Sequence, residues 1–317
     1  MIAAVSSRDR IAQIYHQPFP DLLFEAQRVH REHHDPRQVQ FCTLGNIKSG
    51  ACPEDCGYCA QSVHHNTGLK PEPLMNLDAV LEDAKAAKAG GSTRFCMGAA
   101  WREVRDGAQF DRVLEMVRQV AALELEVCCT LGMLKPHQAQ QLKEAGLTAY
   151  NHNLDTSEEY YSKVITTRTY QDRLETIRAV SDAGISVCCG GILGLGESID
   201  DRISLLETLT TLNPPPESIP INALIPIEGT PLESSTPIDG IALVRMIATT
   251  RVLFPKAMVR LSAGRTQMSD ELQAMCFFAG ANSIFTGAKL LTAPNPERSH
   301  DEELIIDRLG MQPKPLV

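Results

Sequence analysis

The apolar positions of the chain follow two periods, one typical of helices and one typical of strands. Leu22, Ala26 and Val29 recur at helical spacing, which predicts a helix over residues 21–34 that ends at an Asp-Pro pair. Residues 39–47 then form a short apolar run that predicts the first strand. From there to residue 287 the helical and strand patterns alternate without a composition break, which indicates a single α/β unit.

Each predicted strand except the last is followed by a predicted helix, with Gly or Pro at many of the boundaries. The predicted helices after the first span residues 76–91, 110–122, 136–146, 169–184, 200–212, 239–254 and 271–280. The predicted strands after the first span residues 93–98, 125–132, 148–155, 185–192, 218–226, 258–264 and 282–287.

Eight strands with a helix between each pair predict a parallel sheet with right-handed connections. Eight such units favour closure into a (β/α)8 TIM-type barrel, which typically takes ~250 residues. An open, doubly wound sheet is less favoured, because no GxGxxG sequence follows the first strand. We therefore expect one barrel domain over residues 1–317, with a helical N-terminal extension over 1–36 and a short C-terminal tail over 296–317.

The composition limits which cellular compartments and which classes of partner the protein is expected to have. The formal net charge of -9 argues against nucleic acid or an anionic membrane as a partner, and no apolar run approaches the ~20 residues of a membrane span. The chain contains 10 cysteines and no apparent export signal, which points to a reducing compartment where thiols serve metal or redox chemistry. We expect a cytoplasmic protein.

A loop rich in Gly and Pro carries the most specific chemistry in the sequence. Cys52, Cys56 and Cys59 stand in CxxxCxxC spacing directly after the first strand. Three thiolates on a four-iron cluster leave one iron open to a small molecule, and this spacing is that of the radical S-adenosylmethionine (SAM) enzymes. The alternative is a zinc loop completed by a distant Cys or His, such as His64 or His65.

Alternate residues on a strand point to opposite faces, so each predicted strand has an apolar set that faces the helices and a second set that faces the barrel interior. The second set is unusually polar for this fold, and buried polar groups are costly unless they are paired. It consists of Arg94, Cys96, Cys128, Asn151, Asn153, Asp155, Cys188, Asn222 and Arg260.

Three of these interior residues, Cys96, Cys128 and Cys188, form a second set of thiols and favour a second metal centre. Arg260 is on general grounds a counter-charge, because arginine stays protonated. Cys129, Cys189 and Cys276 are interpreted as packing residues. So is Cys42, because it lies early on its strand, away from the C-terminal rim at which barrel chemistry occurs.

Nine segments together resemble the biotin synthase family, in the order that the family has them, between about residues 21 and 295. They are KSGACPEDCGYCAQS, TRFCMGAAW, CCTLG, YNHNLDTSEEYY, ITTRTYQDRLETI, CCGGILGLGE, PPESIPINALIPIEGTPL, VRLSAGR and AMCFFAGANSIF. The resemblance implies radical SAM-dependent sulfur insertion that converts dethiobiotin to biotin. It also implies a [4Fe-4S] cluster on the three loop cysteines, and a sulfur-donating [2Fe-2S] cluster on Cys96, Cys128, Cys188 and Arg260.

The resemblance further implies roles for the remaining polar residues. Those expected to bind SAM are Tyr58, Asn153, Asp155, Arg173, Gly194 and Glu197. Those expected to bind dethiobiotin are Asn151, Asn222 and Thr292, of which Thr292 is followed by Ala293 where a second hydroxyl residue is expected. The implied partners are an electron donor such as a flavodoxin-type protein, iron–sulfur assembly proteins and a second copy of the chain.

Two other functions stay open at this point. Another radical SAM barrel of the hydrogenase-maturation type shares the loop but needs no interior cysteines. A zinc-binding scaffold barrel has no catalytic activity and no affinity for SAM. The thiols of Cys129 and Cys189, each adjacent to a predicted cluster ligand, also leave open a swap of ligand.

Overall fold

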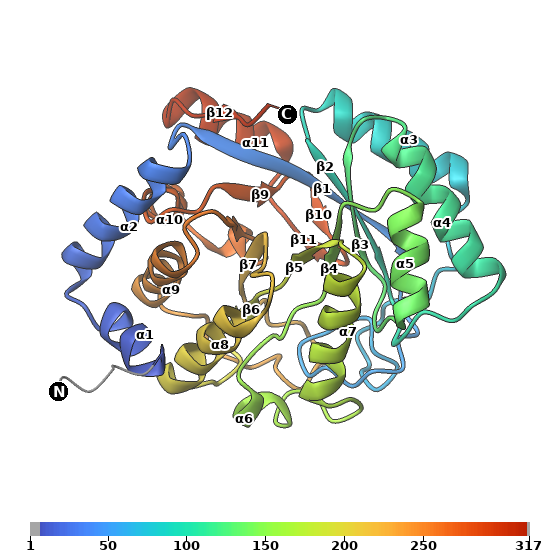
Figure 1. Ribbon diagram of the computed structural model, residues 1–317, viewed down its shortest axis with the longest axis horizontal. Helices are drawn as coiled ribbons and strands as arrows, with labels where there is room; N and C mark the ends of the chain where they lie inside the picture. Colours follow the sequence, from blue (N-terminus) through green and yellow to red (C-terminus); the bar gives the residue numbers. More distant parts are fainter. Residues whose placement is uncertain (1–6, 316–317) are drawn as a thin grey trace.

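Parallel strands close into a barrel in the computed structural model, which describes residues 7–315 (Figure 1). Along the sheet each strand pairs with the next in the order β1-β2-β3-β4-β5-β7-β8-β9, β6 also pairs with β7, and β1 pairs with β9 to close the ring. The strands are β1 (Gln38–Lys48), β2 (Arg94–Ala99), β3 (Glu126–Thr130), β4 (Ala149–Asn151), β5 (Ser186–Cys188), β6 (Gly191–Leu193), β7 (Ser218–Ala223), β8 (Met258–Leu261) and β9 (Ser283–Phe285). The predicted (β/α)8 barrel is confirmed.

Apart from the short helix α6, the helices between the strands lie where the sequence pattern predicts them. They are α3 (Leu77–Ala89), α4 (Ala108–Ala121), α5 (Pro136–Glu144), α6 (Glu158–Tyr161), α7 (Tyr170–Asp182), α8 (Ile199–Thr211), α9 (Gly240–Leu253) and α10 (Asp270–Phe278). Side-chain caps fix several starts: Asn76 accepts from the backbone of Ala79, and Thr169 and Ser198 form capping boxes. These caps fix the residues at which α3, α7 and α8 begin.

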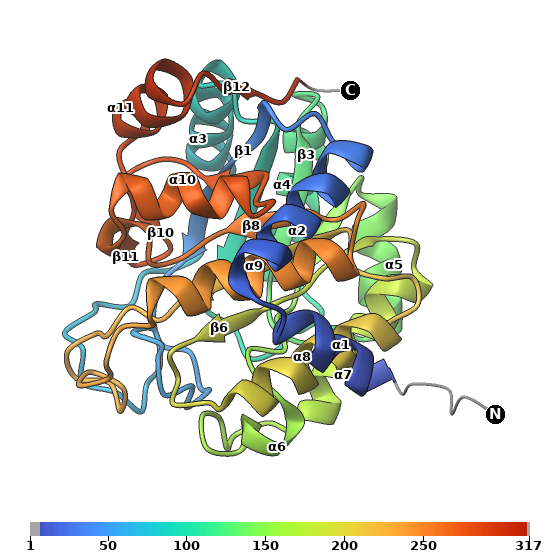
Figure 2. The same ribbon diagram turned by 90° about the vertical axis from the view of Figure 1, so that its left-hand side faces the viewer.

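Two further helices precede the barrel and cover its side. Helix α1 (Ser7–Tyr15) contacts α8 and α9, and α2 (Phe19–His33) lies along α9 (Figure 2). Arg245 of α9 donates to the backbone oxygens of Tyr15 and Gln17, at 2.7 and 2.8 Å, and so holds the link between the two helices.

The C-terminal segment packs more closely than the expected polar tail. A hairpin of β10 (Lys289–Leu290) and β11 (Ala293–Pro294) is followed by α11 (Arg298–Asp301) and a π-helical stretch, Glu302–Arg308. Strand β12 (Gln312–Pro313) then adds to β1 in parallel register. A fully buried ion pair between Arg265 and Asp301 joins this segment to the barrel.

The predicted division of strand residues into two faces is confirmed for the Cys-Cys pairs. Cys129 and Cys189 are fully buried in the core between the strands and the helices, whereas Cys128 lies in a separate buried cluster inside the barrel with Cys96. In the part of the chain that the structure describes, no helix combines the length and the apolar character that crossing a membrane requires.

Candidate functional site

The three loop cysteines follow the end of β1, where the backbone turns sharply. Gly50 and Ala51 both adopt positive φ, 66° and 53°. The amide of Cys52 then donates to the oxygen of Gln61 at 2.9 Å, and the amide of Cys59 donates to the oxygen of Cys56 at 2.9 Å. The loop therefore has its own hydrogen bonds and is neither helix nor strand, as the sequence predicts.

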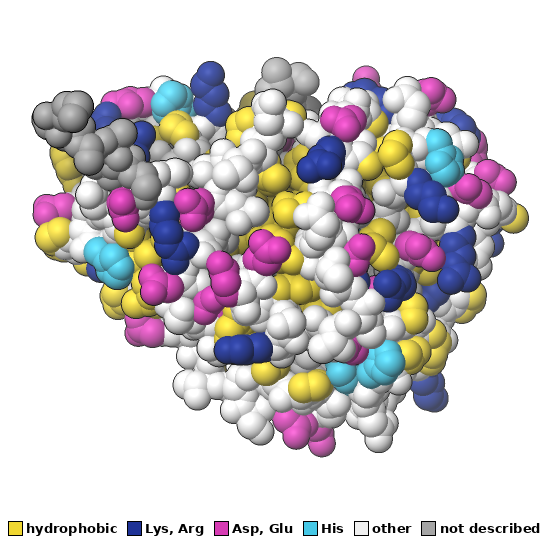
Figure 3. Space-filling model, turned by 60° about the horizontal axis from the view of Figure 1, so that its bottom comes forward, with side chains coloured by type: hydrophobic (Ala, Val, Ile, Leu, Met, Phe, Trp, Pro, Cys, Tyr) yellow, Lys and Arg dark blue, Asp and Glu magenta, His cyan; other side chains and the backbone are white. Residues whose placement is uncertain are grey.

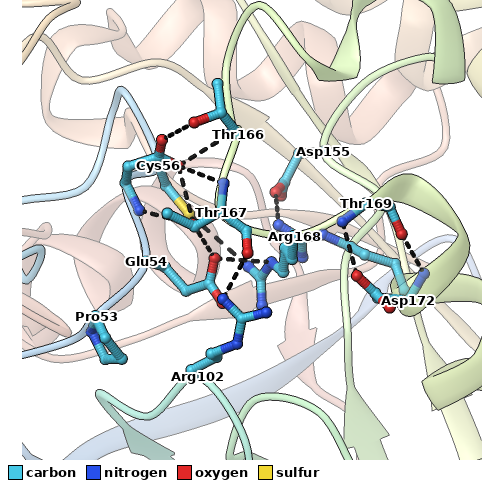
Figure 4. A network of polar contacts seen from close by, with 12 residues as sticks. Pro53, Glu54, Cys56, Arg102, Asp155, Thr166, Thr167, Arg168, Thr169 and Asp172 are labelled. Atoms are coloured by element: carbon cyan, nitrogen blue, oxygen red, sulfur yellow. Dashed lines mark hydrogen bonds and ion pairs between the residues drawn. The ribbon is translucent and has the colours of Figure 1, made fainter.

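A polar network ties this loop to the segment that precedes α7 (Figure 4). The carboxylate of Asp55 accepts from the backbone amides of Thr166 and Thr167 at 2.9 and 3.2 Å. The buried carboxylate of Glu54 lies 3.7 Å from Arg168 and 3.4 Å from Arg102. These contacts fix the loop against a distant part of the barrel and so fix the directions of its thiols.

Burial changes the acidity of the loop thiols in the protein without metal. It raises the pKa of Cys52, that of Cys56 to about 11 and that of Cys59 to about 12, since a thiolate loses its hydration there. Arg168 opposes this shift at Cys56, whose Sγ lies 3.8 Å from an Arg168 nitrogen. The thiols are therefore protonated at neutral pH and must release protons to bind a metal.

The interior cysteines lie below this loop on neighbouring strands. Cys96 and Cys128 are direct register partners on β2 and β3. The hydrogen bond between them raises the pKa of Cys96 and lowers the pKa of Cys128. Cys188 lies on β5, with its Sγ 3.7 Å from Nη1 of Arg260. All four residues are at most 2% exposed, and the structure places Cys96 beside Cys128 and Cys188 beside Arg260.

Arg94 closes the barrel beneath these thiols. Its guanidinium donates to Glu126 at 2.8 Å and to Glu217 at 3.1 Å, on β3 and just before β7. Arg94 is therefore paired with carboxylates from neighbouring positions of the barrel, as a buried charge requires.

Cys42 lies closer to the interior thiols than its early position on β1 indicates, and its interpretation as a structural residue stays a prediction. Its Sγ lies inside the barrel, 3.4 Å from Nη2 of Arg260, and belongs to the same buried cluster as Cys96 and Cys128. The physical reason is the tilt of the strands, which puts an early residue of the long strand β1 beside later residues of the strands across the barrel.

A cavity of about 300 Å³ lies next to the loop thiols. The loop cysteines line it, together with Tyr58, Asn151, Asn153, Asp155, Arg173, Asn222 and Thr292 among the predicted residues. Asn151 connects the cavity to the interior thiols: its Nδ2 donates to Oδ1 of Asn153 at 3.0 Å and lies 3.3 Å from Sγ of Cys188. The Nδ2 of Asn222 donates to the oxygen of Gly191 at 3.0 Å.

A buried charge pair forms one wall of the cavity. Asp155 and Arg173 are in direct contact, and the hydroxyl of Tyr58 donates to the same carboxylate at 2.8 Å. Asp155 adopts φ 68°, a conformation uncommon for a residue other than glycine. Such outliers concentrate at functional sites, where the surroundings hold them in place.

Gly194 and Glu197 are in the turn after β6, outside the residues that line the cavity. The Glu197 carboxylate accepts from the amide of Gly194 at 3.1 Å and from Arg202 at 2.8 Å. The two residues thus stabilise the turn, and a contact between them and a cofactor stays a prediction.

Three residues that belong to the site were not predicted as site residues. Glu54 and Arg168 line the cavity and hold the cysteine loop. His152 also lines the cavity, and its Nε2 has no hydrogen-bond partner. The CPEDC and TTRTY sequences place Glu54 and Arg168 beside recognisable motif residues, but their pairing is a tertiary contact.

The donor set suits iron–sulfur clusters better than a single metal ion. Among residues 7–315, no three or more His, Cys, Asp or Glu side chains are arranged to hold one ion. His64 and His65, the candidate zinc ligands, instead contact the backbone oxygens of Pro53 and Cys56. Two sets of three cysteines suit iron–sulfur groups, for which cysteine is the usual ligand.

Comparisons with known proteins agree with this geometry. Residues 46–209 match the Radical SAM superfamily, and residues 220–312 match the Biotin and Thiamin Synthesis associated domain. The chain is 72% identical over 309 residues to a biotin synthase from Gloeobacter violaceus, covering 98% of this chain and 97% of that protein. It is 59% identical to a biotin synthase from Christiangramia forsetii, covering 97% and 85% of the two chains. A crystal structure of methylornithine synthase superposes with a TM-score of 0.81 at 18% identity, over 99% of this chain and 96% of that one, and so supports the fold alone.

Proposed function

This chain belongs to the biotin synthase family, and we propose how its residues divide the work of sulfur insertion between two clusters, SAM and the substrate. As a biotin synthase it converts dethiobiotin to biotin in a radical SAM reaction that requires a [4Fe-4S] cluster and SAM. The other radical SAM barrels that it resembles share its fold at low identity, and this likeness does not favour their activities.

Cys52, Cys56 and Cys59 are the ligands of the [4Fe-4S] cluster in this proposal. When bound, that cluster supplies the electron that splits SAM into methionine and a 5′-deoxyadenosyl radical. The proposal is supported by the CxxxCxxC spacing and by the position of all three thiols on the cavity wall. The Glu54 and Asp55 contacts hold the loop so that one side of it faces the cavity.

SAM would lie against the polar wall next to this loop. Asp155 offers a carboxylate to ribose hydroxyls, and Arg173 and Asn153 offer donors to the SAM carboxylate. Tyr58 holds Asp155 through its 2.8 Å hydrogen bond. Gly194 and Glu197 would support the adenosine through the turn that they stabilise, rather than through a direct contact.

Cys96, Cys128, Cys188 and Arg260 hold the [2Fe-2S] cluster that donates the sulfur. Support for this comes from the burial of all four and from the contact between Arg260 and Cys188. Dethiobiotin would occupy the cavity above, with Asn151 and Asn222 bound to its ureido ring and Thr292 to its carboxylate. Asn151 is suited to this role because it lies between the cavity and Cys188.

The partners follow from the same assignment. A flavodoxin-type protein would deliver electrons at the face where the cysteine loop lies, a face that carries charges of both signs and apolar side chains between them (Figure 3). Iron–sulfur assembly proteins would rebuild the [2Fe-2S] cluster, and the chain would act as a homodimer of single-domain subunits.

The observation that carries the proposal is a cavity that the three loop thiols line and that Asn151 connects to the interior thiol of Cys188. Anaerobic reconstitution with iron and sulfide, followed by absorption spectroscopy and a biotin assay, tests it. Cys128→Ala should lose the second cluster and biotin formation yet keep SAM binding, and Cys129→Ala is the matched control on the outer face. If Cys128→Ala retains full cluster content and sulfur insertion, the assignment of the second site fails.

A further inference from the structure

The backbone at Arg168 is fixed next to the cysteine loop by contacts on both sides of it in the chain. Before it, the amides of Thr166 and Thr167 donate to the carboxylate of Asp55, at 2.9 and 3.2 Å. After it, Thr169 caps the N-terminus of α7 through a capping box. The side chain of Arg168 therefore starts from a fixed point between the loop and the helix (Figure 4).

The guanidinium of Arg168 reaches the sulfur of one loop cysteine. Its Nη2 donates to Sγ of Cys56 at 3.8 Å. The sulfurs of Cys52 and Cys59 accept instead from backbone amides of the loop. A substitution cannot remove a backbone donor without rebuilding the loop. The donor to Cys56, in contrast, can be removed by changing a single side chain.

The carboxylate of Glu54 holds Arg168 in this place without neutralising the group of charges. It lies 3.7 Å from Arg168 and 3.4 Å from Arg102, and the Glu54 side chain is 2% exposed. One carboxylate between two guanidinium groups leaves one positive charge. The side chain of Arg102 is 36% exposed, so water screens its charge, whereas that of Arg168 is 9% exposed. The unscreened charge beside the loop thiols is therefore that of Arg168.

The guanidinium of Arg168 also has a donor that the protein leaves unused. Its buried Nε has no hydrogen-bond partner, and Arg168 lines the cavity. The neighbouring Arg173 differs, because it contacts Asp155 and donates to the hydroxyl of Tyr161 and to a backbone oxygen. An unsatisfied buried donor is costly, and an anionic group bound at Cys56 would lower that cost.

The reduction potential of an iron–sulfur cluster depends on the hydrogen bonds to its sulfurs and on the charge around it. Uptake of one electron makes a [4Fe-4S] cluster more negative, with no bond made or broken. A cation that donates to a ligand sulfur stabilises the reduced form more than the oxidised form.

We propose that Arg168 is a positioning residue that acts through Cys56 to raise the reduction potential of the [4Fe-4S] cluster. It thereby eases the transfer of one electron from the donor protein to the cluster. Glu54 keeps the guanidinium beside the sulfur through their ion pair. This inference rests on the proposed function, because it takes Cys56 as a ligand of that cluster.

The test is a redox titration of the reconstituted full chain, followed by the electron paramagnetic resonance (EPR) signal of the reduced [4Fe-4S] cluster. Arg168→Gln should lower the ratio of reduced to oxidised cluster at a fixed potential by about tenfold, a shift of about 59 mV for one electron. Arg168→Lys keeps the charge and should stay within about threefold of the wild type. Arg102→Gln is the matched control: it removes the more exposed arginine paired with Glu54, and should change the ratio by less than about twofold.

A measurement on the unsubstituted chain covers the case in which Arg168→Gln fails to assemble the cluster. With nitrogen-15 arginine, pulsed EPR of the reduced [4Fe-4S] cluster should show a coupling to an arginine nitrogen, and Arg168→Lys should abolish it. The role of Arg168 is overturned by an absent coupling or by one that persists in Arg168→Lys. It is also overturned if Arg168→Gln leaves the potential unchanged or shifts it no more than Arg102→Gln does.

Cys56→Ala in the same experiment tests the proposed function separately. If the wild type forms no four-iron cluster, or if Cys56→Ala retains it, the ligand assignment of the loop is wrong. If the wild type forms the cluster, Cys56→Ala loses it and Arg168→Gln does not alter its potential, the ligand assignment stands and only the role of Arg168 is wrong.

Discussion

Replacing Asp155 by asparagine removes one charge from the buried pair with Arg173 and changes little else. Asparagine has the same shape as aspartate and tolerates positive φ, so the φ of 68° at residue 155 does not cause any effect of this substitution. The side chains of Asp155 and Arg173 are 3% and 4% exposed. Asp155→Asn therefore leaves a guanidinium that is buried and lacks its counter-charge.

The size of the effect follows from the partners that remain. Removal of one member of a buried ion pair costs about 3–5 kcal/mol. Arg173 keeps hydrogen bonds to the hydroxyl of Tyr161 at 2.7 Å and to the oxygen of Asn153 at 2.5 Å, so its donors stay partly satisfied. We expect a loss of about 3 kcal/mol in the free energy of unfolding, at the lower end of that range.

Urea unfolding of the reduced, metal-free protein measures this loss, with Arg173→Met and the double variant completing a thermodynamic cycle. Residues in direct contact should show a coupling energy of about 0.5–3 kcal/mol. Equilibrium binding of SAM to the reconstituted protein should weaken in the same variant, because the ribose loses an acceptor. A loss below about 1 kcal/mol together with no coupling would refute the reasoning, since the pair would then behave as a hydrated surface contact.

Three other expected outcomes test different parts of the molecule. Asp301→Asn should cost about 3 kcal/mol in urea unfolding, because its pair with Arg265 is fully buried, whereas Glu302→Gln, at a partly exposed pair, should cost less than about 1 kcal/mol. The metal-free protein should lose stability as the pH rises from about 9 through about 12, the range set by the raised pKa values of Cys56 and Cys59. The reason is that the native state retains thiol protons that the unfolded state releases. A urea unfolding midpoint that is flat across this range would contradict the assignment of these raised pKa values. Thr292→Val should raise the KM for dethiobiotin by about fivefold, which is equivalent to one lost hydrogen bond of about 1 kcal/mol. The same variant should leave SAM binding unchanged. An unchanged KM would show that Thr292 does not bind the substrate.

The sequence predicted the barrel because most of its signals are local. Helix caps such as Asn76, the alternation of strand residues and the CxxxCxxC loop each depend on neighbours in the chain. The elements that it missed depend on distant partners. Strand β12 has only two residues and exists because Gln312 pairs with Gln38. The strand expected over residues 148–155 is shorter in the structure, and its ladder of hydrogen bonds ends at Asn151. Beyond Asn151 the chain bends, so that Asp155 forms a bridge with Gly191.

The placement of Cys42 shows which part of a barrel site strand patterns cannot supply. Parity correctly selects the side chains that point inward, since that depends only on odd and even positions. Height in the barrel depends on the tilt and register of all the strands, and these are fixed by how the ring closes between β9 and β1. Once the closure is known, a residue at the fifth position of an 11-residue strand lies level with Cys188, the last residue of a 3-residue strand. Position along a strand is therefore a poor guide to position along the barrel axis.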